Sequence, residues 1–162
     1  VLPAPKGVKV VHIQTARELL KNVHAAFEAA DVLIMAAAVA DYRPAEVANQ
    51  KIKKTAQNKT MTLKLVRNPD ILKTVGASKR PGQLVIGFAA ETTDLIANAE
   101  KKIKSKHLDL IVANDVSNQK IGFNSDNNQV TFLFANGSQK KTPLESKSKV
   151  AEALIAIISQ KL

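Results

Sequence analysis

The feature that most constrains the fold is an uninterrupted apolar run, Val32 to Ala38, which directly follows Asp31. A strand with one exposed face alternates apolar and polar residues, whereas a run without alternation is typical of a strand buried on both faces. Two later runs have the same character, Leu84 to Ala90 and Leu108 to Ala113. Because such strands need helices on each side of their sheet, the sequence predicts an α/β fold with a parallel core.

Helical patterns occupy much of the sequence between and around these runs. Thr15 and Glu18 form a capping-box motif in front of an apolar stripe with helical spacing. Asn68 followed by Pro69 is a typical helix start, with Asn as the N-cap and Pro at the first helical position. Two further helices are predicted, and their N-caps are Thr92 or Thr93 for one and a residue near Ser146 for the other.

The remaining segments favour additional strands. Val8 to Ile13 and Met61 to Val66 alternate as strands do, and Asn136-Gly137 is a strong turn signal inside a hairpin over 130–142. No internal repeat or linker divides the chain. We therefore predict one α/β domain over residues 1–162, with a doubly wound, mostly parallel, Rossmann-like sheet and an antiparallel hairpin as an appendage.

Composition excludes several kinds of chemistry. The chain has no cysteine, which excludes disulfides, thiolate metal sites and a cysteine nucleophile. His12, His24 and His107 lack the spacing of zinc ligands. No nucleophile elbow, Walker loop or Gly-x-Gly-x-x-Gly motif is present. The longest apolar run, Val32 to Ala40, is far shorter than the roughly 20 residues of a membrane helix. With no signal-peptide pattern in residues 1–7, we expect a cytoplasmic protein with no membrane partner.

The formal net charge of +10 has three open explanations. Clustered basic residues bind nucleic acid by releasing counterions from phosphates. Single-strand binding also uses aromatic platforms, however, and the chain has five Phe, one Tyr and no Trp. A basic groove for a small polyphosphate ligand explains the charge equally well, and so does a solvated, lysine-rich surface.

Polar segments are predicted at one edge of the sheet. Ligands of open α/β sheets bind beyond the carboxyl ends of the strands. Each polar segment there has a structural reading as a cap or a turn, but together they favour a nucleotide or phosphate site. The backbone N–H groups at the helix start near Pro69 also suit an anion. The segments are Asp41–Arg43, Asn68–Asp70, Phe88–Glu91 and Asn114–Asp115.

Six motifs give the chain a specific resemblance that covers nearly its whole length. The sequence resembles the synthetase half of the bacterial bifunctional phosphopantothenoylcysteine decarboxylase/phosphopantothenate–cysteine ligase family. The motifs occur in the family's order, and a chance match to all of them is hard to obtain. They are Ala36–Pro44, Lys51–Lys54, Asn68–Leu72, Gly87–Thr92, Ala113–Ser117 and Gly122–Asn127.

The resemblance implies a ligase of coenzyme A biosynthesis. In this family the carboxylate of 4′-phosphopantothenate attacks CTP to give an acyl-cytidylate, and the amine of cysteine then displaces CMP. The implied requirements are Mg²⁺ and CTP, with FMN only in the decarboxylase half, and the implied partners are a fused or neighbouring decarboxylase domain and a second copy of the chain. No nucleic acid is implied. A basic nucleic-acid-associated α/β domain remains the alternative.

The resemblance also assigns roles to individual residues. Lys51 is expected to stabilise charge during activation, and Lys51 to Lys54 to belong to a closing lid. Phe88 is expected to hold the base, while Asp41 would meet either the ribose or the metal. Asn114 and Asp115 are left open between structural and functional roles. The implied nucleotide contacts are Asp41, Lys51, Pro69, Asp70, Ile71, Leu72, Phe88, Lys102 and Lys106, and the implied substrate contacts are Ala37 and Ala38.

Three further expectations concern the start of the domain, its dimer surface and a pair of lysines. Family members open this domain with a strand and a Gly-rich loop, which do not occur before Val1, so the resemblance implies an N-terminally truncated domain that lacks its first strand, loop and helix. Dimerisation in the family uses strands beside the core sheet, for which 130–142 is the candidate here. Lys102 and Lys106 are four residues apart on one predicted helix, so their charges should repel unless an anion is shared between them.

Overall fold

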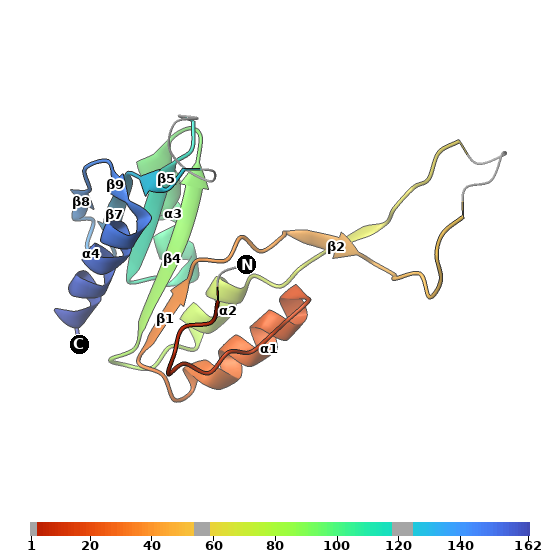
Figure 1. The fold of residues 1–162 in the computed structure, drawn as a ribbon, viewed down its shortest axis with the longest axis horizontal. Helices are drawn as coiled ribbons and strands as arrows, with labels where there is room; N and C mark the ends of the chain where they lie inside the picture. The colour runs from red at the N-terminus through yellow and green to blue at the C-terminus, as the bar shows by residue number, and fades with distance from the viewer. Residues whose placement is uncertain (1–2, 54–58, 118–124) are drawn as a thin grey trace.

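A five-stranded sheet forms the centre of the computed structural model, which describes residues 3–53, 59–117 and 125–162 (Figure 1). The strand order is β1-β4-β5-β7-β8. The first three are mutually parallel, and β7 and β8 add an antiparallel hairpin beside β5. The bounds of the strands are Val32–Met35 for β1, Leu84–Glu91 for β4, Leu110–Asp115 for β5, Val130–Phe134 for β7 and Gln139–Lys141 for β8.

Helices cover both faces of this sheet. One face packs against α1 (Ala16–Phe27), α2 (Ile71–Ala77) and α3 (Leu95–Lys106), and the other packs against α4 (Lys147–Ser159). The alternation of side chains in β4 separates the two cores, because Val85 faces the three helices and Ile86 faces α4. The predicted doubly wound α/β fold, mostly parallel with an antiparallel hairpin, is therefore confirmed.

Two short antiparallel pairs lie outside the main sheet. The first joins β2 (Tyr42–Pro44) to β3 (Leu65–Arg67), and Figure 1 shows that this pair begins an arm that extends away from the body. We use "the arm" for residues 42–53 and 59–67. The second pair joins β6 (Asn127–Asn128) to β9 (Glu145–Ser146), just in front of α4.

Two strand predictions are corrected by the structure. Val8 to Ile13 is an exposed, irregular segment rather than a strand, and it belongs to none of the sheets formed by the described residues. Met61 to Val66 was expected as one strand of the domain, but only Leu65–Arg67 is a strand, and it belongs to the arm. An alternating pattern by itself does not specify the partner strand.

Helix starts were predicted with mixed success. The capping box of Thr15 and Glu18 and the Ser146 cap of α4 are confirmed. The N-cap of α2 is Asp70 rather than Asn68, and its side chain accepts a hydrogen bond from the N–H of Lys73 at 3.1 Å. The N-cap of α3 is Asp94, without a side-chain cap and with a left-handed φ of 49°, so neither predicted threonine has that role.

Helices α2 and α3 approach each other unusually closely at one point. A Cβ atom at Gly76 would lie 2.0 Å from the carbonyl oxygen of Lys106, the last residue of α3. Only a residue without a side chain fits there. Gly76 therefore fixes where the end of α3 lies relative to α2, and both helices line the cavity described next.

Candidate functional site

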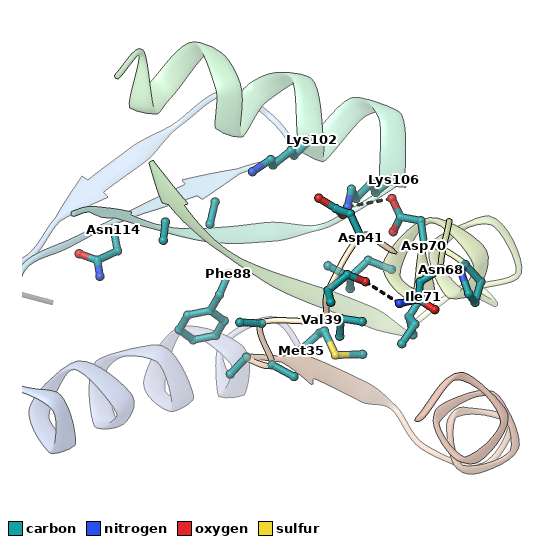
Figure 2. Close-up of a pocket in the computed structure, with 18 residues that line it drawn as sticks. Met35, Val39, Asp41, Asn68, Asp70, Ile71, Phe88, Lys102, Lys106 and Asn114 are labelled. Atoms are coloured by element: carbon teal, nitrogen blue, oxygen red, sulfur yellow. Dashed lines mark hydrogen bonds and ion pairs between the residues drawn. The ribbon is translucent and has the colours of Figure 1, made fainter. Parts of the chain in front are cut away.

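A cavity of about 490 Å³ opens at the carboxyl ends of β1, β4 and β5. Its size is within the range of small-molecule sites, and its place at this edge is the one expected for a doubly wound sheet. Figure 2 shows the residues that surround it. They are Met35, Ala36, Ala37, Ala38, Val39, Ala40, Asp41, Asn68, Pro69, Asp70, Ile71, Leu72, Phe88, Ala89, Ala90, Lys102, Lys106 and Asn114.

One wall of the cavity is the irregular segment that follows β1. The predicted buried run stops being a strand at Met35, which is paired with Gly87, and Ala36 to Asp41 then leave the sheet to line the cavity. The side-chain amide of Asn68 donates to the carbonyl oxygen of Ala40 at 2.8 Å, and its backbone N–H donates to the carbonyl oxygen of Asp41 at 2.8 Å. Asn68 therefore holds this wall in place instead of capping α2.

The base of the arm is fastened to the same point. The guanidinium of Arg43 donates to the carbonyl oxygen of Arg67 at 2.5 Å and to the amide oxygen of Asn68 at 3.2 Å. Arg43 thus links β2, β3 and the cavity wall. Any movement of the arm is expected to be felt at Asp41, which is adjacent in sequence to β2.

Two of the four lysines of α3, Lys102 and Lys106, reach the cavity, and each is paired with an acid. Lys106 lies 2.9 Å from the carboxylate of Asp70, and Lys102 forms an ion pair with Glu91. The second oxygen of Glu91 accepts from the amide of Asn98 at 3.3 Å. The expected repulsion between the lysines is therefore offset in the protein without ligand, because each charge already has an opposite charge beside it.

Asp70 serves both as a helix cap and as an ion-pair partner. Burial would raise the pKa of Asp70, but the hydrogen bonds from Lys106 and from the N–H of Lys73 outweigh it and leave the pKa below its usual value. A depressed pKa in the folded state means that the ionised carboxylate stabilises the fold above pH about 4. That contribution is lost as the pH falls through the lowered value.

We expect Asp70→Asn to separate these two roles. Asparagine is as good an N-cap as aspartate but cannot pair with Lys106 as an anion. The melting temperature of Asp70→Asn should therefore lie below that of the unsubstituted protein at pH 7, and the two should converge toward pH 3. Asp70→Ala should lose about 1 kcal/mol more at all pH values, because the cap is removed. A difference between Asp70→Asn and the unsubstituted protein that does not change with pH would contradict the ion-pair role.

The opposite end of the cavity is uncharged. Phe88, from β4, is 41% exposed in spite of its size and lines the cavity. Asn114, at the same edge of β5, also lines it, whereas Asp115 does not. The carboxylate of Asp115 instead accepts from the N–H and the hydroxyl of Ser117 at 2.9 and 2.6 Å, which lowers its pKa. The two residues whose roles the sequence left open therefore differ in position: Asp115 closes a turn, and Asn114 lines the cavity.

Most of the predicted site residues are brought together, and one is not. Every predicted contact except Lys51 lines the cavity. Lys51 lies in the arm and is absent from the lining, and Lys54 of the predicted lid lies outside the described residues. The sequence reasoning assigned no site role to Met35, Ala36, Val39 and Ala40, which also line the cavity, whereas Ala89 and Ala90 lie inside the segment Phe88–Glu91 that it had selected.

Two classes of feature are absent from the described ranges. Over residues 3–53, 59–117 and 125–162, no group of three or more His, Cys, Asp or Glu side chains could hold a metal ion. In the same ranges no helix has the length and apolar character needed to cross a bilayer.

Comparison with known proteins gives one consistent family. Residues 1–162 match the model of the DNA/pantothenate metabolism flavoprotein C-terminal domain. The coenzyme A biosynthesis bifunctional proteins CoaBC of Vibrio vulnificus strain CMCP6 and Escherichia coli K12 are 42% and 46% identical over 154 and 155 residues. Each alignment covers 95% of this chain but 38% of the relative, so the chain spans about two fifths of the length of these relatives.

A solved structure supports the same relationship. The crystal structure of the C-terminal domain of a CoaBC protein superposes with a TM-score of 0.79 at 36% sequence identity. That comparison covers 98% of this chain and 68% of the solved one. Sequence and fold therefore agree on the relationship over nearly all of the chain.

Proposed function

This chain belongs to the family of the DNA/pantothenate metabolism flavoprotein C-terminal domain, and from that premise we propose that it forms the amide bond between 4′-phosphopantothenate and cysteine in coenzyme A biosynthesis. One observation carries the proposal: a single cavity gathers nearly every residue that the ligase resemblance assigns to nucleotide and substrate. These residues come from four separate segments of the chain. The names of the relatives supply the pathway, since they are coenzyme A biosynthesis proteins.

The proposed reaction has two steps. A carboxylate at neutral pH is a poor acylating agent, so a carboxylate oxygen of phosphopantothenate first bonds to the α-phosphorus of CTP while the bond to the β-phosphate oxygen breaks. Pyrophosphate leaves and an acyl-cytidylate remains. The amine of cysteine then attacks the acyl carbon, CMP leaves with its oxygen, and the nitrogen loses a proton to give the amide.

Within the cavity we assign the charged end to the triphosphate. Lys102 and Lys106 would exchange their partners Glu91 and Asp70 for phosphate oxygens, and the backbone of residues 69–72 would lie against the same group. Stabilising the charge of phosphates by fixed donors is the main way in which such reactions are accelerated. Phe88 would hold the base, and Ala37 and Ala38 would lie against phosphopantothenate or the acyl-nucleotide.

The cavity lining includes a carboxylate that would help to hold a divalent cation. Mg²⁺ at nucleotide sites is held by one or two carboxylates and by substrate phosphates. Asp41 lines the cavity and would be such a carboxylate, or would meet the ribose. Bound there, Mg²⁺ would neutralise part of the phosphate charge. We assign FMN to the decarboxylase half of the longer relatives and not to this chain.

The function is tested by following pyrophosphate. The protein that carries this chain is incubated with CTP, Mg²⁺ and cysteine, and pyrophosphate release is measured with and without phosphopantothenate. Release that requires phosphopantothenate is expected, and phosphopantothenoylcysteine should accumulate. No phosphopantothenate-dependent release from the protein would reject the ligase assignment.

Replacing Lys102 and Lys106 with glutamine should remove most of the thermal stabilisation that CTP provides. A ligand raises stability by RT ln(1 + [L]/Kd), so weaker binding directly lowers the shift in melting temperature. The matched control is Lys140→Gln with Lys141→Gln on β8, which removes the same charge outside the cavity. The control should retain the CTP shift. An equal loss in both double variants would mean that general positive charge attracts the nucleotide, as in the nucleic-acid-binding alternative.

We also propose a homodimer that is formed through the arm. Apolar side chains that are more than half exposed gather along it: Val47, Ile52, Met61, Leu63 and Leu65. Exposed apolar surface of this kind favours a protein partner. The hairpin over 130–142 is the less suitable surface, because its outer strand β8 presents Lys140 and Lys141 and like charges would face each other.

Sedimentation equilibrium tests the dimer. The unsubstituted chain should have twice the mass of one chain, and Ile52→Glu with Leu63→Glu should shift it to the monomer. Ile155→Glu is the control, because Ile155 is an equally exposed apolar residue on α4 and far from the arm in Figure 1. A dimer that survives the arm variant would place the interface elsewhere.

A further inference from the structure

Glu91, the last residue of β4, lies next to the charged end of the cavity without lining it. Its carboxylate forms an ion pair with Lys102, which does line the cavity. Both side chains are partly shielded from solvent, with 18% of Glu91 and 40% of Lys102 exposed. Charges in such a setting act on each other more strongly than fully hydrated charges do. The positive charge that Lys102 offers to a phosphate is therefore already partly neutralised.

A second residue of α3 holds the carboxylate of Glu91 in place. The side-chain amide of Asn98 donates to the other carboxylate oxygen of Glu91 at 3.3 Å and to the carbonyl oxygen of Thr93 at 3.1 Å. Asn98 and Lys102 are four residues apart and lie on the same face of α3. When Lys102 turns toward a phosphate, Asn98 still holds Glu91. The negative charge of Glu91 therefore stays beside the phosphate site.

We propose that Glu91 is a resident counter-ion of Lys102, which competes with phosphate oxygens for that lysine and so promotes the release of pyrophosphate. The inference rests on the function proposed above, because it takes Lys102 as a phosphate contact. Glu91 touches no substrate in this role and acts only through Lys102.

The proposed reaction gives such a counter-ion a use. Pyrophosphate has to leave after the first step, while the acyl-cytidylate stays for the second. A site that held the highly charged product tightly would slow the whole cycle, since product release often limits kcat. As pyrophosphate departs, Lys102 returns to Glu91, so the ammonium exchanges one anionic partner for another and neither charge is left unpaired.

Glu91→Gln separates the charge of this side chain from its hydrogen bonds. Glutamine keeps an oxygen that accepts from Asn98 or Lys102, but it carries no charge. In the protein without ligand, the melting temperature should fall slightly, because a partly exposed ion pair is lost. Phosphate affinity should change in the opposite sense, because the full charge of Lys102 becomes available. A purely structural role for Glu91 would instead lower stability and affinity together.

The probe is inorganic pyrophosphate, whose binding is measured by calorimetry at about 0.15 M salt, where distant charges are screened. The Kd of Glu91→Gln for pyrophosphate should be about fivefold lower than that of the unsubstituted protein, as expected for removing one nearby negative charge. CTP should also bind more tightly. Pyrophosphate should inhibit the ligase reaction of this variant at correspondingly lower concentrations.

The matched control is Glu100→Gln, on an exposed face of the same helix. It changes the net charge by the same amount and should leave the Kd for pyrophosphate unchanged. An equal gain in both variants would assign the effect to net charge and overturn the inference. An unchanged or higher Kd in Glu91→Gln would overturn it as well. If Glu91→Gln does not fold, Glu91→Ala removes the same charge, and the same fall in Kd is expected.

The two proposals fail in different ways. If the unsubstituted protein binds neither pyrophosphate nor CTP, Lys102 is not a phosphate contact and both proposals are rejected. If it binds them but makes no phosphopantothenoylcysteine, the ligase function is rejected, and the Kd of Glu91→Gln still decides the counter-ion role. If it makes the product and Glu91→Gln binds pyrophosphate no more tightly, only the counter-ion role is rejected.

Discussion

Lys51→Ala should lower kcat for phosphopantothenate-dependent pyrophosphate release by about 10²–10³-fold, the usual effect of removing one donor that stabilises charge in a transition state. The proposed role of Lys51 develops only as charge builds on the α-phosphate. CTP affinity should therefore fall much less than kcat. Rate measurements at saturating substrate and CTP-dependent thermal shifts are compared on the same preparations.

The control for Lys51 is Lys59→Ala, which lies in the arm but outside the predicted lid Lys51 to Lys54. It removes the same charge from an exposed position of the arm and should change kcat little. Because Lys51 is outside the cavity in this structure, the prediction also requires that the arm bring it to the nucleotide during the reaction. An unchanged kcat with only a raised KM would make Lys51 a simple binding contact.

Among the five glycines of the described residues, Gly76 should be the one whose replacement by alanine is most damaging. The new Cβ would lie 2.0 Å from the carbonyl oxygen of Lys106, which is main chain and cannot move away as a flexible side chain would. Such overpacking costs about 3 kcal/mol, which corresponds to a fall of roughly 10 °C in the melting temperature of a chain of this size. CTP binding should weaken as well, since Lys106 must shift.

Gly82→Ala is the matched control. A Cβ at Gly82 meets no atom within 4 Å, although its φ of +87° makes any side chain unfavourable by about 1 kcal/mol. It should therefore lower the melting temperature only slightly and leave CTP binding unchanged. If both variants lose the same stability, the close approach of α2 and α3 does not decide the position of Lys106.

The core of the fold was predictable because its signals are local. The runs that contain Leu84 and Leu110 are long and apolar enough to require burial on both faces, and they became β4 and β5. The run from Val32 to Ala38 was expected to be a strand of the same kind, but that prediction is wrong in part: only Val32–Met35 is a strand, and because it lies at the edge of the sheet Ile34 is 39% exposed. The shared direction of β1, β4 and β5 then placed the polar segments that follow them at one edge. That argument reached eight of the eighteen residues of the cavity lining, and the family resemblance added Ala37, Ala38, Ile71, Leu72, Lys102 and Lys106.

What failed depended on partners far away in the sequence. Asn68 is of a residue type that often caps helices, but its side-chain amide donates a hydrogen bond to the carbonyl oxygen of Ala40, 28 residues earlier in the sequence. The ion pair of Lys106 joins the ends of two different helices, and no spacing rule connects it to Asp70. The pairing of β2 with β3 at the base of the arm was missed for the same reason, because the alternation in Met61 to Val66 indicates a strand but not which strand it pairs with.

The outer position of β1 has a practical consequence. Within the described residues, β1 has a neighbour only on the β4 side, so one row of its backbone N–H and C=O groups is open. An open edge of this kind recruits strands from other molecules. The net charge of +10 opposes such encounters at low ionic strength, and added salt screens that repulsion. A solution of the purified protein is therefore expected to become turbid sooner at high ionic strength than at low ionic strength.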